Sequence, residues 1–191
     1  KSPSDIECGA MGKLSRQRHY DVNYLFVEGM INSDQSTLVL RGATTTTLDE
    51  IERGFDDALG VVSLVLNGDD IVHGGGSAFA SMASYLRSEA ASAQGRSQMA
   101  IEAFADSLEI IPATIAENGG HDPLDCILAL RHKNQDGAFD YGPDLENGGI
   151  TSMFELGVCE PMSLVRQAVL SATEVTTAIL KIDDMIAKKG V

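Results

Sequence analysis

Three groups of residues have types and spacings that could do chemistry. Two adjacent acids, Asp56 and Asp57, fall in a helical pattern, where a carboxylate can orient or deprotonate water. A glycine triplet at 74–76 precedes another helical pattern, and backbone without Cβ atoms lets a ligand come close. Glu160 stands directly before a proline at a third helix start, where an acid can also cap the helix. Each group also has an ordinary structural interpretation: a solvated acid, a flexible turn and a cap.

The helix that must position the two acids is predicted over residues 47–67. Thr47 and Glu50 have the spacing of a capping box, and Gly68 is suited to end the helix at the C′ position. Apolar residues recur at intervals of three and four, which predicts a buried face made of Leu48, Ile51, Phe55, Leu59, Val62 and Leu66. The two adjacent acids cannot share that face. No Lys-Ser/Thr pair follows the glycine triplet, so the triplet is not a Walker loop.

The remaining pattern predicts an α-rich body with a small β portion near the N-terminal end. Strand-like runs occupy 24–29 and 37–42, separated by a turn-rich connector at 30–36. Further helices are predicted at residues 77–94, 96–118, 123–133, 151–157 and 161–188, and a polar connector at 134–149 has the composition of a β-hairpin. The residues expected to face inward are Phe79, Met82, Tyr85, Leu86, Met99, Phe104, Leu108 and Ile111. Pro112 is expected to kink its helix or split it in two.

Composition narrows the class of protein. Hydrophobic residues make up 43% of the 191-residue chain, enough for a real core, and with 5% aromatic residues that core must rely on aliphatic packing. The net charge of −14 argues against nucleic acid or an anionic membrane as a partner. This acidity fits either a salt-adapted cytoplasm or an ordinary acidic protein. Three widely spaced cysteines without a C-x-x-C pair indicate a reducing, cytoplasmic setting.

Four long motifs follow one another along the chain: LVLRGATTTTLDEIERGFDDALGVV, IVHGGGS, AFADSLEIIPATIAENGGHDPLD and LGVCEPMSLVRQAVLSATEVTTAILKIDDMIA. In this order they resemble the group II chaperonins, the archaeal thermosome and its eukaryotic cytosolic relatives. The resemblance implies a mainly α fold: one half of a helical equatorial domain, an intermediate-domain helix and a small β portion where the chain leaves the apical domain. The implied divisions are 1–41 for the apical exit, 42–73 for the intermediate segment and 74–191 for the C-terminal half of the equatorial ATP-binding domain.

The resemblance also implies roles for individual residues. Asp57, directly before Ala-Leu in its helix, matches the family's water-activating carboxylate, while Asp56 keeps the interpretation of a surface acid. The residues that match the family's nucleotide contacts are Gly74, Gly75, Gly76, Asp144, Leu145 and Glu160. Of these, the glycines would close over the ribose and base, Glu160 would accept hydrogen bonds from the ribose hydroxyls, and the other two would offer backbone to the adenine. One position departs from the family: Phe79 stands where a glutamate is usual, which leaves the role of that glutamate open.

The function implied by the resemblance is that of an ATP-dependent chaperone subunit. Such a subunit binds and hydrolyses ATP with Mg²⁺ and drives the folding of non-native polypeptides inside a double ring of chaperonin subunits in the cytoplasm. The family's phosphate loop lies upstream of the region matched here, so we expect either the C-terminal segment of a subunit or a truncated paralogue, inactive as an ATPase by itself and without metal ligands. The alternative is a non-catalytic holdase or assembly module whose exposed apolar helices bind subunits or unfolded chains.

Overall fold

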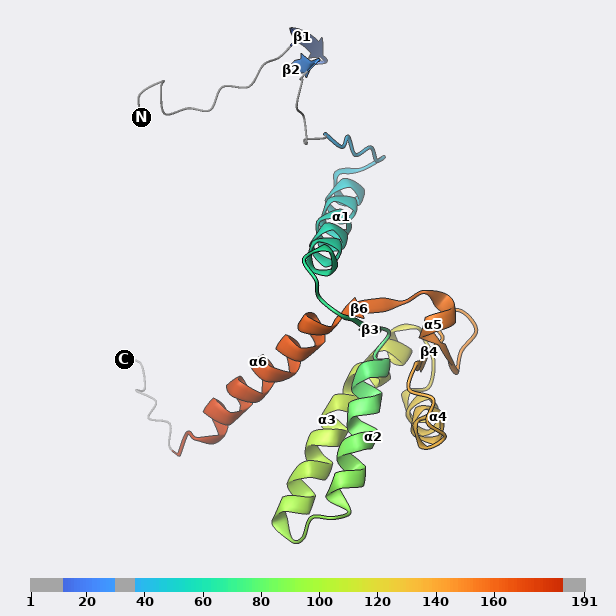
Figure 1. Ribbon diagram of the computed structural model, residues 1–191. Coiled ribbons are helices and arrows are strands. Elements are labelled where there is room, and N and C mark those ends of the chain that lie inside the picture. Colours follow the sequence, from blue (N-terminus) through green and yellow to red (C-terminus); the bar gives the residue numbers. More distant parts are fainter. Residues whose placement is uncertain (1–11, 30–36, 184–191) are drawn as a thin grey trace, which may run out of the picture. The chain divides into compact units, whose positions relative to one another are not determined.

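The computed structural model describes residues 12–29 and 37–183, and within them the chain is mainly α-helical, as predicted (Figure 1). Two compact units are present, Lys1–Gly54 and Phe55–Val191. The elements, in chain order, are β1 (Lys13–His19), β2 (Val22–Glu28), α1 (Thr45–Leu66), β3 (Ile71–His73), α2 (Ser77–Ala90), α3 (Arg96–Asn118), α4 (Pro123–Gln135), β4 (Tyr141–Pro143), β5 (Ile150–Ser152), α5 (Met153–Leu156), β6 (Cys159–Pro161) and α6 (Met162–Leu180).

The first unit contains an antiparallel hairpin in which β1 pairs with β2, with Lys13 opposite Glu28 and His19 opposite Val22. The predicted strand at 24–29 is confirmed within β2. Strand β1 was not predicted, because its sequence, KLSRQRH, is polar and gives little strand signal. The predicted strand at 37–42 is wrong: these residues have no regular secondary structure, since no described strand pairs with them. The predicted connector at 30–36 lies outside the described residues.

Helix α1 begins earlier than its sequence pattern predicts. The Thr44 hydroxyl accepts the Thr47 N–H at 3.2 Å, so Thr44 is the N-cap residue. The predicted capping box is wrong, because Glu50 pairs with Arg53 on the next turn instead of reaching back. No residue of α1 is buried in this structure, so the predicted burial of its apolar face is also wrong: no described element covers that face.

The end of α1 follows the prediction closely. Gly68 has a φ of 96° and donates its N–H to the Val65 carbonyl at 3.0 Å. Asp69 donates its N–H to the Leu64 carbonyl at 3.2 Å. These two bonds form a Schellman motif, in which glycine takes the left-handed C′ position without steric cost.

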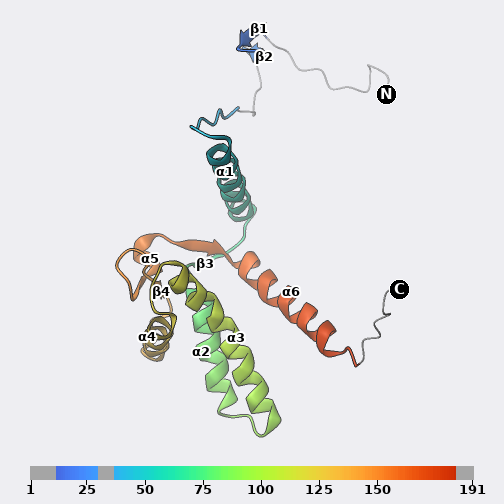
Figure 2. The same ribbon diagram turned by 180° about the vertical axis from the view of Figure 1, so that it is seen from behind.

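Helices α2 and α3 lie side by side in both views, and the contacts of α4 with α2 and α3 complete a helical body in the second unit (Figures 1 and 2). Alanine dominates the contact between α2 and α3: Ala83 and Ala105 are fully buried, which lets the two backbones approach closely. One core cluster consists of Phe79, Ala83, Ala105, Leu108 and Val165, and a second of Ala80, Ala116, Cys126, Ile127 and Leu130.

The large apolar residues expected to face inward are only partly in the core. Phe79 and Leu108 are buried as predicted, and Met82 and Leu86 pack against them. The prediction is wrong for four others, which are 36–70% exposed: Tyr85, Met99, Phe104 and Ile111. Their places at the helix contact are taken by alanines, which a search for large apolar residues passes over.

Helix α3 runs without interruption from Arg96 to Asn118, so of the two expected effects of Pro112, a kink or a split, the split does not occur. A proline inside a helix removes one backbone hydrogen bond, and the structure gives a reason for keeping it there. Pro112 is fully buried and lies directly against Gly76, at the start of α2. The predicted end of this helix at Asn118 and the predicted start of α4 at Asp122-Pro123 are both confirmed, with the Asp122 carboxylate accepting the Leu124 and Asp125 N–H groups.

Two small antiparallel sheets complete the second unit. Strand β3 pairs with β6, which brings residues 71–73 beside residues 159–161. Strands β4 and β5 form a hairpin, which confirms the one predicted from the polar connector, although its second strand begins just after residue 149. Helix α6 ends at Leu180, short of the predicted 188, and residues 184–191 lie outside the described part of the chain.

Candidate functional site

The glycine triplet forms a tight turn between β3 and α2. Gly75 and Gly76 have φ values of 62° and 79°, in the left-handed region that favours glycine. A Cβ on Gly76 would lie 3.0 Å from the Cβ of Pro112, and a Cβ on Gly75 would lie 2.5 Å from the Sδ of Met153. Glycine is therefore required at these positions both by the backbone conformation and by the neighbours packed against it.

Glu160 lies beside this turn although it is 84 or more residues away in the sequence. Strand pairing places Glu160 opposite Val72, and the Gly74 N–H donates to the Val158 carbonyl at 3.0 Å. A Cβ on Gly74 would lie 3.1 Å from the Glu160 Oε1 atom, so the carboxylate is adjacent to the first glycine. The β3–β6 pairing thus joins two of the groups singled out in the sequence.

The β4–β5 hairpin approaches the same turn. A Cβ on Gly142 would lie 2.9 Å from the Gly75 carbonyl oxygen and 3.0 Å from Met153 Cγ. The hairpin loop that follows carries Asp144 and Leu145. The Leu145 side chain is 52% exposed, and its Cδ2 atom would lie 2.8 Å from a Cβ on Gly119, at the end of α3.

Asp144 uses its polar groups to build this loop. Its Oδ1 atom accepts the N–H groups of Glu146 and Asn147, both at 3.0 Å, and its Oδ2 atom accepts the Asn147 side-chain amide at 3.2 Å. These bonds, that from the Asn147 backbone foremost, lower the pKa of the Asp144 carboxyl. Its backbone N–H and carbonyl are bonded to Gly149 and Gly148. Asp144 therefore shapes the loop, and its neighbour Leu145 is the residue whose side chain the loop presents.

The structure brings together the glycine triplet, Glu160 and the hairpin that carries Asp144 and Leu145. Asp57 is not among the residues that it brings together. Asp57 and Asp56 are both exposed on the middle turns of α1.

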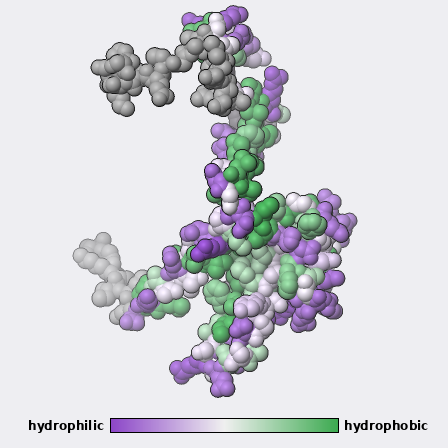
Figure 3. All heavy atoms as spheres, viewed as in Figure 1, coloured by the Kyte–Doolittle hydropathy of each residue, from purple (hydrophilic) through white to green (hydrophobic). Residues whose placement is uncertain are grey.

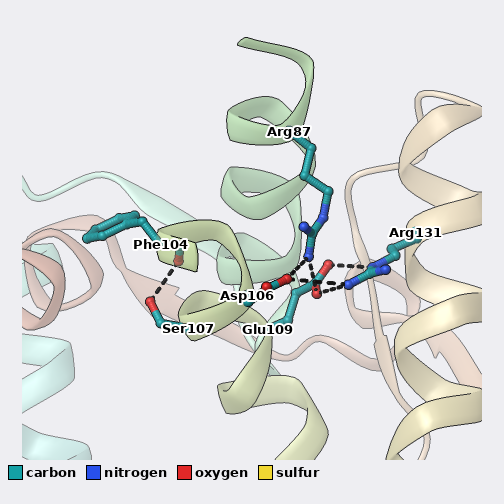
Figure 4. A network of polar contacts seen from close by, with 6 residues as sticks. All are labelled: Arg87, Phe104, Asp106, Ser107, Glu109 and Arg131. Carbon is teal, nitrogen blue, oxygen red and sulfur yellow. Dashed lines mark hydrogen bonds and ion pairs between the residues drawn. The ribbon is translucent and has the colours of Figure 1, made fainter. Parts of the chain in front are cut away.

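A cluster of charges in the helical body was missed from the sequence (Figure 4). Glu109 on α3 is only 6% exposed, and its carboxylate accepts bonds from Arg87 on α2 and from Arg131 on α4. The exposed Asp106 also bonds Arg87, at 2.8 Å. Hydrogen bonding to Glu109 raises the pKa of Arg131. The available signal was an acid on the buried face of α3, at helical spacing from the buried Ala105 and Pro112.

Phe79, where the resemblance leads one to expect a glutamate, is a core residue. It is 7% exposed and packs with Ala83, Ala105, Leu108 and Val165. In this chain the position therefore contributes apolar contact between α2, α3 and α6.

The glycine turn has a carboxylate, that of Glu160, beside its first residue. The space beside Glu160 is one that a Cβ on Gly74 would fill, and a carboxylate there can accept bonds from two hydroxyl groups.

Among the described residues no group of three or more His, Cys, Asp or Glu side chains is arranged to hold a metal ion. In the same part of the chain, no helix is long and apolar enough to cross a membrane.

The sequence model of the TCP-1/cpn60 chaperonin family matches residues 1–190. The chain belongs to this family. Its relatives include thermosome subunit alpha of Halobacterium salinarum, 42% identical over 187 residues that cover 96% of this chain and 33% of the relative. A thermosome subunit of Methanopyrus kandleri is 46% identical over 165 residues, which cover 86% of this chain and 30% of the relative. The predicted resemblance to group II chaperonins is confirmed, and the chain spans about one third of the length of these relatives.

A solved structure supports the same assignment. The open-state monomer of a group II chaperonin from Methanococcoides burtonii aligns with a TM-score of 0.62 and 34% sequence identity, covering 88% of this chain and 42% of the other. The mainly α arrangement is thus shared with a chaperonin of known structure.

Proposed function

We propose that this chain supplies part of the ATP site of a chaperonin subunit, and that the complete subunit is an ATP-dependent molecular chaperone. The observation that carries the proposal is the meeting of the glycine triplet, Glu160 and the β4–β5 hairpin at one end of α2, in a chain that belongs to the chaperonin family. These three parts come from distant stretches of sequence, and the strand pairing and close packing around the triplet bring them together.

Each part has a role in holding ATP as substrate. Gly74 lies against the Glu160 carboxylate because it lacks a Cβ atom, and the turn of Gly74, Gly75 and Gly76 closes over the ribose and base. Glu160 accepts hydrogen bonds from the ribose hydroxyls. Asp144 and Leu145 offer backbone to the adenine, in the loop that the Asp144 carboxylate builds. These contacts orient the nucleotide and leave its phosphates to groups outside the described set.

Asp57 is the proposed group for hydrolysis. Its carboxylate orients a water molecule for attack on the γ-phosphorus and takes the proton that the water loses, while the bond from that phosphorus to the leaving ADP oxygen breaks. Mg²⁺, when bound, neutralises charge on the phosphates. Because Asp57 lies on α1, between the apical exit proposed at 1–41 and the equatorial segment proposed at 74–191, movement of the intermediate segment at 42–73 would deliver it to the nucleotide.

The partners proposed for the complete subunit follow from this function. They are other chaperonin subunits in a double ring and non-native polypeptides in its cavity, in the cytoplasm. The charge of −14 disfavours nucleic acid and anionic membranes as partners.

One observation favours a second candidate, a holdase or assembly module without turnover. An apolar groove of about 680 Å³ between α3 and α6 is lined by residues such as Phe104, Ile111 and Val169, and apolar segments of other proteins could occupy it. The two candidates differ in one measurable property, which is the hydrolysis of ATP.

The test uses a chimera, in which this chain replaces the matching 191 residues of the Methanocaldococcus jannaschii thermosome subunit, 40% identical over all of this chain. Asp57→Ala in the chimera should lower ATP turnover by about 100-fold or more, because a general base contributes that much, while ADP affinity stays within about twofold. The matched control is Asp56→Ala, which should leave turnover unchanged. Equal turnover in the Asp57→Ala chimera would remove Asp57 from the mechanism, and a parent chimera that binds client protein but no nucleotide would favour the holdase.

A further inference from the structure

The buried carboxylate of Glu109 connects three helices. Its Oε1 atom accepts the Nε–H of Arg131 at 2.8 Å, and its Oε2 atom accepts one Nη2–H from Arg131 and one from Arg87, each at 2.5 Å. Both oxygens are therefore occupied, and the two arginines come from α2 and α4, both of which contact α3 (Figure 4).

The charges in this cluster balance. Two arginines face two acids, of which Glu109 has 8% and Asp106 64% of its side chain exposed. A buried carboxylate destabilises the folded state unless it is paired and hydrogen-bonded. The free energy of unfolding therefore depends on keeping the three helices in the arrangement that pairs Glu109.

Helix α3, which carries Glu109, also contacts the glycine turn. Pro112 lies three residues after Glu109 and therefore on the same face of α3. The ring and backbone of Pro112 pack directly against Gly76, since a Cβ on Gly76 would meet the Pro112 Cβ, Cα and N atoms at 3.0–3.2 Å. A displacement of α3 would move Pro112, and the glycine turn packed against it would change its conformation.

We propose that Glu109 is a positioning residue for the nucleotide: with Arg87 and Arg131 it fixes α3, and α3 holds the glycine turn through Pro112. This inference rests on the proposed function, since it concerns how the same ATP site keeps its geometry. Glu109 acts through the helix and touches no substrate.

The first test is Glu109→Gln in the assembled chimera. The amide keeps the size of the side chain but removes the charge that holds the two arginines. We expect the dissociation constant for ADP to rise by about tenfold while kcat at saturating ATP stays within about twofold, as for a change in coupling at a distance from the chemistry. The matched control, Asp106→Asn, removes the exposed acid of the same cluster and should leave ADP affinity unchanged.

A purely structural role predicts a different result. Loss of folded protein would lower kcat and the number of ADP sites per ring in parallel, with the dissociation constant of the remaining sites unchanged. That result, or an unchanged dissociation constant with full occupancy, would overturn the proposal. A parent chimera that binds no ADP would contradict the proposed function itself.

A second variant decides the matter if Glu109→Gln fails to assemble. Arg131→Lys keeps a positive charge beside Glu109, so no uncompensated carboxylate is buried, but one ammonium cannot reproduce the paired bonds of a guanidinium. ADP affinity should fall by about threefold, a smaller loss than for Glu109→Gln. The exposed Arg166→Lys on α6 is the control and should have no effect. Unchanged affinity in the Arg131→Lys chimera would overturn the proposal.

Discussion

Two acids that look alike in the sequence, Asp144 and Glu160, have different surroundings in the folded chain. Asp144 is used by its own loop, with both carboxylate oxygens bonded to Asn147 or Glu146. Glu160 instead lies beside Gly74, across a strand pair that no local pattern announces. At the scale of single residues, the carboxylate that lies against the first glycine of the turn is that of Glu160.

The loop role of Asp144 predicts a pH dependence. Its pKa is lowered in the folded chain, so its contribution to stability is present above its unfolded pKa of about 3.9 and is lost as the pH falls through the lower folded value. Asp144→Ala in the chimera should lower the thermal unfolding temperature at pH 7, and the difference from the parent should shrink on acidification below about pH 4.

Thermal unfolding from pH 7 to pH 3 measures this effect. The control is Asp144→Asn, which keeps an oxygen acceptor for the loop N–H groups but cannot titrate. It should retain more stability than the alanine variant. A difference between parent and Asp144→Ala that does not change with pH would show that the loop bonds do not depend on the charge.

At the scale of elements, the two glycine turns that flank β3 give a matched pair. Gly68 at the end of α1 has a φ of 96° and no atom within 4 Å of a built Cβ. Gly76 at the start of α2 has a similar φ but lies against Pro112. The first therefore tests backbone conformation alone, and the second tests conformation together with packing.

We expect Gly68→Ala to cost about 1 kcal/mol of stability, the usual cost of a left-handed alanine. Gly76→Ala should lower the stability by more, since Pro112 must also move. It should weaken ADP binding, whereas Gly68→Ala should not. Urea unfolding and ADP titration of the two chimeras measure both effects. Equal losses of stability and unchanged ADP affinity in both would contradict the close packing of Gly76.

The elements also show what the sequence could predict. Helix ends were accessible where chemistry marks them, as at Gly68 and at Asp122-Pro123, because the capping bonds are local. The start of α1 was not, since four consecutive threonines at 44–47 offer several N-caps and Thr44 is the one used. Strand β1 and the β3–β6 pair escaped prediction because a strand depends on a partner elsewhere in the chain.

The residues of the candidate site can also be separated into those that the sequence predicted and those that it did not. The motif match selected the glycine triplet, Glu160 and Asp57, but it gave no contacts between them. The residues that support the turn, Pro112 and Met153, carry no local signal, because a proline or a methionine acquires such a role only through packing. For Glu109 the signal was limited to its place on the buried face of α3, which does not name the arginines that bind it.

At the scale of the whole molecule, the chain exposes many large apolar side chains. The chain spans about one third of the length of its relatives, and many large apolar side chains in the described second unit face solvent. Among the most exposed are Met99, Ile110, Leu124, Val175, Ile179 and Leu180, each at least 60% exposed. Hydrophobic side chains are visible at the surface along α1 and over the helical body (Figure 3).

Such a surface predicts how the 191-residue chain behaves by itself. Apolar area left in water is unfavourable by about 25 cal/mol per Å², so chains should associate through these faces and through the groove between α3 and α6. We expect strong binding of an apolar fluorescent dye and self-association at micromolar concentration, with both reduced per chain in the chimera. Analytical ultracentrifugation and dye titration measure the two properties. A dye-negative monomer would contradict the exposure of these faces, and the holdase candidate would then lose the surface on which it depends.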